Sequence, residues 1–278
     1  LFWVCRTVKT PLSAVLVTPS PSSARVTRPP AWATALLLAA LTVIAAHELL
    51  TAVCGPDKAC RWTVLPAVCG VLLLARAVWP GCAALEGLLL AAALTLPLSG
   101  VLTNGKPHAL TFTDVCAMAA AGFAIPWAFS GLYGLRTLDN GYLLVLTPLV
   151  AAFCSDALAL FTGMACGKHK LAPLVSPHKT VEGALGGLAG GMAGMAIFCA
   201  VFRAMTHPAL SYSLCIALGL LGAVLGELGD LSFSAVKRQY GIKDYGRLLP
   251  GHGGVLDRFD SVLFAAPVLC ALLRALAA

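Results

Sequence analysis

The sequence predicts an all-α, polytopic integral membrane protein with about eight transmembrane helices, or nine if residues 1–20 add a poorly apolar span. Hydrophobic residues make up 59% of the 278 residues, and charged residues only 11%. Soluble domains are typically ~45–50% apolar and ~25% charged, so the chain lies well outside that class. Several apolar runs reach the ~20 residues that a helix needs to cross the ~30 Å hydrocarbon core of a bilayer.

The chain divides into a tail and two sets of helices. Residues 1–31 are rich in Ser, Pro and Arg and are expected to form a flexible tail. The expected spans are residues 32–52, 62–79, 81–102, 113–135, 141–165, 181–203, 209–231 and 259–277. The first four form an N-terminal region, 32–136. The others form a C-terminal region, 137–278, which carries two polar loops, 166–183 and 232–258.

The composition also limits the chemistry. Most of the 11 cysteines lie inside apolar runs, with neither a CxxC pair nor zinc spacing, so they are expected to act as small hydrophobes. A disulfide between Cys54 and Cys60 is a less favoured alternative. The net charge of +7 comes from basic residues between the spans, which indicates contact with membrane lipids rather than nucleic acid.

The basic residues predict an orientation. Loop 166–183 contains three lysines and loop 232–258 five basic residues, whereas the connection between the two intervening spans has only Arg203. Two spans separate the loops, so they share one face, and the positive-inside rule places that face in the cytoplasm. With eight spans the N-terminus falls outside, although the basic residues Arg6, Lys9, Arg25 and Arg28 argue for inside. That conflict stays open.

A polar stripe runs along the end of the seventh span. On a helix, Glu227, Asp230, Ser234, Lys237 and Arg238 fall within an arc of about 100°. Acidic residues at membrane depth normally face a protein interior or a water-filled cavity. The alternative is a helix end that extends incidental charge toward water.

A second polar cluster, PGHGGVLDRFD, stands at the entry to the last span. Asp257 and Asp260 flank Arg258, and the preceding glycines leave backbone amides open to close approach by a phosphate. Carboxylates such as Asp230 and Asp257 are hard oxygen ligands for Mg²⁺, and Lys and Arg neutralise phosphate oxygens. These residue types favour phosphoryl or nucleotidyl transfer at the cytoplasmic face.

From Ser234 to Asp260 the chain reads SAVKRQYGIKDYGRLLPGHGGVLDRFD, which resembles the signature of phosphatidate cytidylyltransferases, also called CDP-diacylglycerol synthases. A second stretch, GKHKLAPLVSPHKTVEGALGG, is similar to further elements of that family. One departure is DALAL at 156–160, where the family often has Asp-Thr-Gly-Ala-Tyr. Asp156 is kept, but its polar and aromatic neighbours are not.

The resemblance implies a nucleotidyltransferase that condenses CTP with phosphatidate to give CDP-diacylglycerol and pyrophosphate in phospholipid biosynthesis. Asp230 and Asp257 would bind Mg²⁺, with room for a second cation, and Ser234 and Lys237 would complete the catalytic set. The expected substrate-binding residues are Arg238, Lys243, Asp244, His252, Gly253, Gly254, Arg258, Asp260, Lys179 and Asp156. The enzyme would lie in the inner membrane with its site toward the cytoplasm, and a homodimer stays open.

The residue types fit this reaction even when the family resemblance is set aside. A phosphate monoester is largely ionised near neutral pH and needs no strong base, and no Ser/His/Asp order or activated Cys is evident. Structural alternatives remain for several residues: Asp260 could orient Arg258, Glu227 and Asp156 could make packing contacts, and His252 could stabilise a turn. His47 and Glu48 are expected to anchor or pair rather than react.

Two other functions remain as alternatives. A related CTP-dependent enzyme could act on another lipid phosphate or on a polyprenol. A membrane transporter is more remote, because transport favours acidic residues near the midplane of several spans together with an internal repeat.

Overall fold

A computed structural model of the chain describes residues 31–79, 83–105, 109–206, 210–246, 248 and 253–277. Residues 1–30 of the expected N-terminal tail, together with Arg247 and His252, therefore lie outside the described residues, and residue 31 already begins the first described helix.

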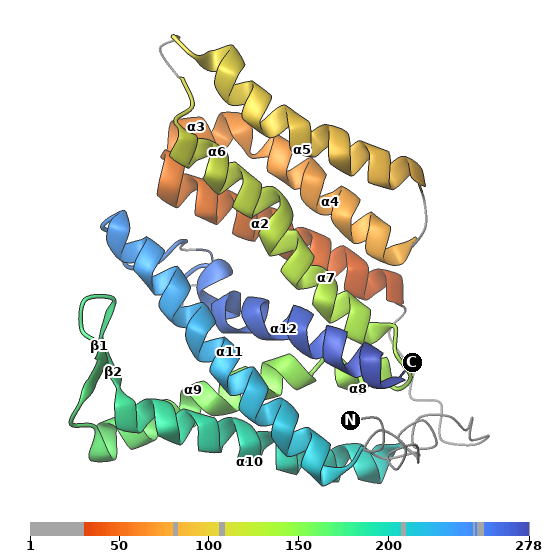
Figure 1. The fold of residues 1–278 in the computed structure, drawn as a ribbon, viewed down its shortest axis with the longest axis vertical. Coiled ribbons are helices and arrows are strands. Elements are labelled where there is room, and N and C mark those ends of the chain that lie inside the picture. The colour runs from red at the N-terminus through yellow and green to blue at the C-terminus, as the bar shows by residue number, and fades with distance from the viewer. Residues whose placement is uncertain are drawn as a thin grey trace, which may run out of the picture.

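The described chain is helical apart from one β-hairpin (Figure 1). Its helices are α2 (Ala31–Cys54), α3 (Pro56–Trp62), α4 (Val64–Val78), α5 (Ala83–Thr103), α6 (Phe112–Ala119), α7 (Ile125–Arg136), α8 (Gly141–Leu144), α9 (Thr147–Cys166), α10 (Val181–Met205), α11 (Tyr212–Gln239) and α12 (Leu256–Ala277). A π-helical turn, η1 (Ala120–Ala124), joins α6 to α7. The antiparallel hairpin pairs β1 (Lys170–Ala172) with β2 (Ser176–Thr180).

Within the described residues, six helices or continuous helical segments are long and apolar enough to cross a membrane. They are Ala31–Cys54, Phe112–Arg136, Gly141–Cys166, Val181–Met205, Tyr212–Gln239 and Leu256–Ala277. Each coincides with a predicted span, which confirms a multi-pass helical membrane protein. The spans expected at 62–79 and 81–102 correspond to α4 and α5, which are not among the six.

Two polar loops differ from expectation. Helix α11 continues to Gln239, so the loop expected at 232–258 starts later and the polar stripe lies on regular helix. The other loop forms a β-hairpin that was not expected, with Pro177 in strand β2, whereas α10 begins at Val181, where the predicted span 181–203 begins. The Thr180 Oγ1 accepts a hydrogen bond from the Gly183 N–H at 3.1 Å, which satisfies one of the unpaired amides of the first helical turn.

Glycines bring the C-terminal helices close together. A Cβ at Gly190 of α10 would lie 2.5 Å from the Cys154 carbonyl oxygen of α9, and a Cβ at Gly229 of α11 would lie 2.5 Å from the Asp260 carbonyl oxygen of α12. Membrane helices lack a hydrophobic force between them and associate through such close van der Waals packing. The glycines thus set the spacing of the helices that carry the polar residues.

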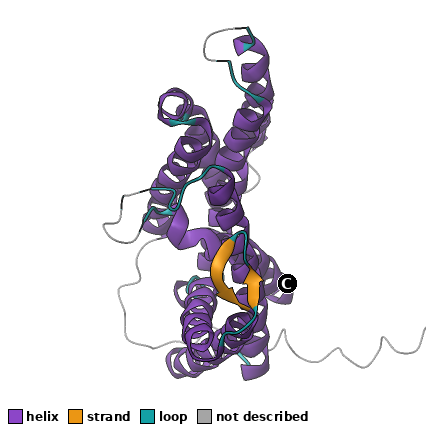
Figure 2. Cartoon of the chain, turned by 90° about the vertical axis from the view of Figure 1, so that its left-hand side faces the viewer, coloured by secondary structure: helices purple, strands orange, loops and turns teal. Residues whose placement is uncertain are grey.

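Helix α12 lies between two groups of helices (Figure 1). It packs against α7 of the N-terminal group and against α9 and α11 of the C-terminal group. The hairpin and the C-terminal end of α11 lie on the same side of the bundle, at the left of Figure 1. Figure 2 views the molecule from that side, with the hairpin in front of the helix ends. The two basic segments therefore share one face, as predicted.

Candidate active site

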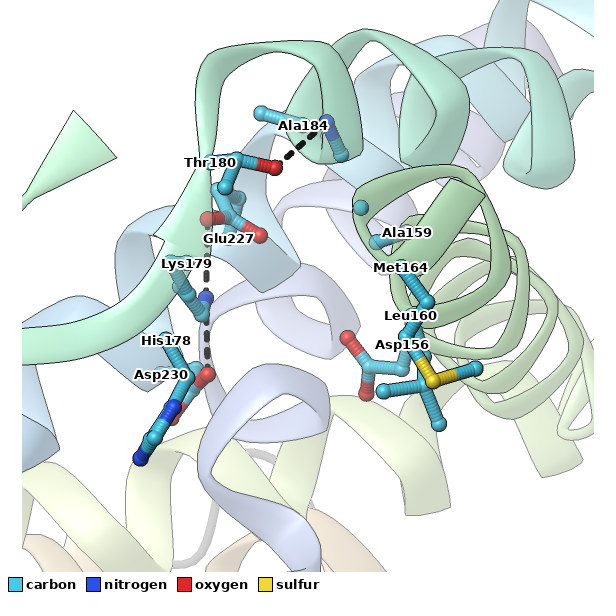
Figure 3. A pocket seen from close by; sticks show the side chains of 12 residues that line it. Asp156, Ala159, Leu160, Met164, His178, Lys179, Thr180, Ala184, Glu227 and Asp230 are labelled. Atoms are coloured by element: carbon cyan, nitrogen blue, oxygen red, sulfur yellow. Dashed lines mark hydrogen bonds and ion pairs between the residues drawn. The ribbon is translucent and has the colours of Figure 1, made fainter. Parts of the chain in front are cut away.

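A cavity of about 440 Å³ opens where α9, β2, α10 and α11 meet (Figure 3). Helix α9 contributes an apolar wall that includes Leu160 and Met164, while β2 and α11 contribute charged side chains. The full lining consists of Asp156, Ala159, Leu160, Gly163, Met164, His178, Lys179, Thr180, Gly183, Ala184, Glu227 and Asp230. A space with one apolar and one charged wall suits an amphiphile such as a lipid phosphate.

Lys179 is the lysine of this cavity and joins the hairpin to α11. Its Nζ lies 2.8 Å from Glu227 Oε1 and 2.7 Å from Asp230 Oδ2, as the dashed lines of Figure 3 show. Burial alone would lower the pKa of Lys179, but the nearby carboxylates, Asp230 foremost, outweigh it and raise the pKa above its ordinary value of 10.5. Lys179 is therefore cationic throughout the neutral range.

Asp230 has a second partner on its own helix. The Ser234 hydroxyl donates to Asp230 Oδ1 at 3.2 Å, one helical turn away. Glu227, Asp230 and Ser234 therefore line one face of α11, as the 100° projection predicted.

Two more carboxylates interact electrostatically with Asp230. The charge of Asp156, on α9, interacts with those of Asp230 and Glu227. The charge of Asp260, on α12, interacts with Asp230, Lys237 and Asp156. One Asp260 oxygen also accepts the Ser261 N–H at 2.7 Å. Acidic charge thus exceeds the positive charge that Lys179 supplies.

A second ion pair lies further along α11. Lys237 Nζ lies 2.9 Å from Asp257 Oδ1, and the two side chains are only 11% and 5% exposed. The other oxygen, Asp257 Oδ2, accepts the Tyr245 N–H at 2.8 Å and the Gly254 N–H at 3.0 Å. Burial and the nearby Asp257 carboxylate raise the pKa of Tyr245, which keeps its hydroxyl protonated. Both Asp257 oxygens therefore have donors.

The turn before Asp257 needs glycine. Gly253 has a φ of +81°, a conformation that L-residues with a side chain rarely adopt. A Cβ at this position would also lie 3.1 Å from Asp257 Oδ2.

The other predicted site residues fall outside the cavity lining. Arg238 is exposed, and its Nε donates to the Val175 carbonyl of the hairpin at 3.1 Å. Lys243, Asp244 and Arg258 are also exposed. The joint metal role predicted for Asp230 and Asp257 stays a prediction, since each carboxylate has its own partners here.

Sequence reasoning missed two contributions to this face. The first is the hairpin, whose β2 strand delivers Lys179. The second is the identity of the partners of Glu48 on α2: this residue was expected to anchor or pair, and it accepts the backbone N–H groups of Val255 and Leu256, directly before Asp257. An acidic residue inside an apolar run was the available signal for Glu48, since such residues normally have a partner within the protein.

Comparison with known proteins identifies the family of the chain. The profile of the cytidylyltransferase family matches residues 13–276. The chain belongs to this family. Both polar segments and the cavity fall within the matched region.

Named family relatives are similar over much of their length. The phosphatidate cytidylyltransferase of Bacillus subtilis (strain 168) is 35% identical over 248 residues, which cover 86% of this chain and 87% of the relative. That of Staphylococcus epidermidis (strain ATCC 35984) is 34% identical over 197 residues, 70% of this chain and 71% of the relative. That of Staphylococcus haemolyticus is 37% identical over 158 residues, 57% of this chain and 58% of the relative.

Proposed function

We propose that this cytidylyltransferase family member is a phosphatidate cytidylyltransferase, which condenses CTP with phosphatidate to give CDP-diacylglycerol and pyrophosphate. The observation that carries the proposal is the cavity in which Lys179 is held between Glu227 and Asp230, with the buried Lys237–Asp257 pair further along α11. The names of the relatives point to the same reaction.

The lipid substrate would enter from the side. Its acyl chains would stay in the bilayer while the phosphate enters the cavity between the apolar wall of α9 and the charged wall of α11. Leu160 and Met164 are 60% and 68% exposed and line that cavity, so they are available to contact the glycerol backbone or the first methylenes.

In the proposed step, an oxygen of the lipid phosphate attacks the α-phosphorus of CTP. The bond from that phosphorus to the bridging oxygen breaks, and pyrophosphate leaves with the electron pair. The attacking monoester is already ionised, so no side chain has to remove a proton. The protein's task is to bring two polyanions together, for which the ammonium groups of Lys179 and Lys237 are suited.

The carboxylates fit a divalent cation by their chemistry. Asp156, Asp230 and Asp260 offer hard oxygen donors whose charges interact, and negative charge is in excess. Among the described residues no three His, Cys, Asp or Glu side chains already converge on one point. We propose that Asp230 holds Mg²⁺ together with Asp257 or these neighbours. Once bound, the ion would neutralise phosphate charge and stabilise the leaving pyrophosphate.

We also propose the finer topology. The chain would have eight spans, with α4 and α5 as a membrane hairpin, and would lie in the inner membrane. The face formed by the β-hairpin and the end of α11 would meet the cytoplasm, where CTP is found. The lysines at 168, 170, 179, 237 and 243 on this face support that orientation.

Membranes or purified protein should convert CTP and phosphatidate to CDP-diacylglycerol in the presence of Mg²⁺ and lose that activity with EDTA. Asp257→Asn and Asp230→Asn should each lower turnover by on the order of 100-fold or more, because each removes a charge from the site. Asp57→Asn is the matched control, since Asp57 is exposed on α3. Pyrophosphate release and labelled CDP-lipid are the measurements.

The lipid substrate that accepts the cytidylyl group distinguishes the proposal from its nearest alternative, a CTP-dependent enzyme that acts on another lipid phosphate or on a polyprenol. Phosphatidate should react, whereas polyprenyl phosphate and a free polyprenol should not. If phosphatidate gave no product while another acceptor did, the specific substrate would be wrong but CTP-dependent transfer would stand.

A further inference from the structure

We infer that Glu48 on α2 is a positioning residue for the candidate active site: it fixes the start of α12 and thereby the direction of the Asp257 carboxylate. The inference rests on the proposed function for its kinetic test, but its geometric basis is independent of it. Glu48 lies 207 residues before Val255, in the N-terminal helix group, which contributes no residue to the cavity lining described above.

Both carboxylate oxygens of Glu48 accept hydrogen bonds from backbone amides at the start of α12. Oε1 accepts the Val255 N–H at 3.0 Å, and Oε2 accepts the Leu256 N–H at 2.8 Å. The first amides of a helix have no partner within the helix, and the helix dipole favours a negative charge at that end. Glu48 thus supplies from another helix the cap that α12 needs.

The surroundings leave no easy substitute for this cap. Glu48 is 6% exposed, Val255 4% and Leu256 0%. Water therefore has little access to the two amides, and a buried N–H without an acceptor costs about 1–3 kcal/mol.

Glycines at two positions make room for the carboxylate. A Cβ at Gly254 would lie 2.5 Å from both Glu48 oxygens, and a Cβ at Gly246 would overlap Glu48 Oε1. Both glycines belong to the segment that resembles the family signature. Their space is used by a side chain of the protein, in addition to any phosphate approach expected from the sequence.

The cap acts on Asp257 through the chain itself. Asp257 directly follows Leu256, and its Oδ2 accepts the N–H of Gly254, which directly precedes Val255. Asp257 is therefore linked to the two residues bound by Glu48 on both sides. Releasing Val255 and Leu256 would let this turn rotate and would disturb the 2.9 Å contact between Asp257 and Lys237. Glu48 contacts the backbone of the turn before Asp257 and no side chain proposed to contact substrate, so it positions rather than reacts.

The test compares Glu48→Gln with Glu48→Asp and with Asp114→Asn. Gln keeps the size of Glu but removes the charge and places an N–H₂ group against a backbone N–H. Asp keeps the charge but is one methylene shorter. Asp114 is the matched control: it is 4% exposed in the same helix group and accepts the Thr111 N–H and the Lys58 ammonium, away from α12.

Glu48→Gln should lower kcat by on the order of 10- to 100-fold with little change in the KM for CTP, because a small misplacement of a catalytic group has effects of that size. Amide hydrogen exchange in residues 253–260 should become faster. Glu48→Asp should give values of kcat and of amide exchange in residues 253–260 that lie between those of Glu48→Gln and the wild type. Asp114→Asn should lower the melting temperature while leaving kcat per folded protein and exchange in 253–260 unchanged.

The inference is overturned if Glu48→Gln folds with unchanged kcat, or if exchange in residues 253–260 stays as in the wild type. It is also overturned if Asp114→Asn lowers kcat as much as Glu48→Gln. If Glu48→Gln does not fold, Glu48→Asp decides: exchange in 253–260 must rise. If the wild type makes no CDP-diacylglycerol, the proposed function fails, and the exchange measurement still decides the role of Glu48.

Discussion

Lys179 is held in the cavity by two carboxylates of one helix face, Glu227 and Asp230, at 2.8 and 2.7 Å. Its position at the end of strand β2 lets a residue of a short hairpin complete a site otherwise formed by membrane helices. In the proposed function, this ammonium would exchange its carboxylate partners for phosphate oxygens when substrate binds.

Replacing Lys179 with Met should remove about 1–3 kcal/mol of stability, since Glu227 and Asp230 lose a charged partner. The pKa of Lys179 is raised above 10.5, so this contribution is complete below about pH 10.5 and is lost only as pH rises through the higher folded-state value. The gap in melting temperature between wild type and Lys179→Met should therefore stay constant from about pH 7 to 10.

Lys170→Met is the control for that measurement, because Lys170 is exposed on the other strand of the same hairpin. Its melting temperature should match the wild type. A gap for Lys179→Met that already narrows between about pH 7 and 9 would contradict a raised pKa.

Helices α9 and α10 approach each other closely because glycine, rather than a large side chain, stands where they cross. At Gly190 a Cβ would meet the Cys154 carbonyl oxygen at 2.5 Å and the Leu158 Cβ at 2.7 Å. Asp156 lies between those two residues on α9, so the spacing of the helices also sets how deeply Asp156 reaches into the cavity.

Gly190→Ala should therefore cost about 1–3 kcal/mol through overpacking and should also lower turnover, because α9 must move. Gly87→Ala on α5 is the matched control: beyond its own stretch of helix, no described atom lies within 4 Å of its Cβ position, and alanine is the better helix former. The measurements are melting temperature in detergent and CDP-diacylglycerol formation. Equal melting temperatures for both variants would refute the packing argument.

The hairpin is tied to α11 by Arg238, whose Nε donates to the Val175 carbonyl at 3.1 Å. Arg238→Lys keeps the charge but loses this planar donor. It should speed hydrogen exchange in residues 170–180 and raise the KM for CTP a few-fold, since Lys179 is then less firmly placed. Asp57→Asn, at an exposed position on α3 outside the candidate site, should change neither quantity. Unchanged exchange in Arg238→Lys would show that the tie is dispensable.

The whole molecule has two unequal faces. The face with the hairpin and the end of α11 carries most of the lysines, whereas Arg136, Arg203 and Arg274 stand near the helix ends of the opposite face. This asymmetry is the basis of the proposed orientation.

An impermeant maleimide should therefore reach the two faces differently in intact cells. Cys166 is exposed beside the hairpin and should react only after the membrane is opened. A cysteine introduced at Ser213, exposed at the start of α11, should react at once. Peptide mass spectrometry would separate these sites from the other cysteines. Labelling of Cys166 in intact cells would reverse the proposed topology.

Much of this arrangement could be predicted from sequence. Apolar runs located six membrane helices, although α11 continues to Gln239, past its expected end at 231. Helical periodicity placed Asp230 beside Ser234. The hairpin escaped because its strands are too short for an alternating pattern to register. The role of Glu48 escaped because its partners are backbone amides 207 residues away, which leave no trace in residue type.

The contact of Glu48 with α12 also bears on how the protein is made. Helix α2 is the first span described and α12 the last. Glu48 is therefore synthesised well before Val255 and Leu256, whose N–H groups it accepts. At synthesis rates of about 5–20 residues per second, the carboxylate waits on the order of 10–40 s for them. A chain cut short before α12 would keep an unpaired acidic group at the bilayer edge. The candidate active site is therefore complete only after α12 has been synthesised and its first amides have reached Glu48.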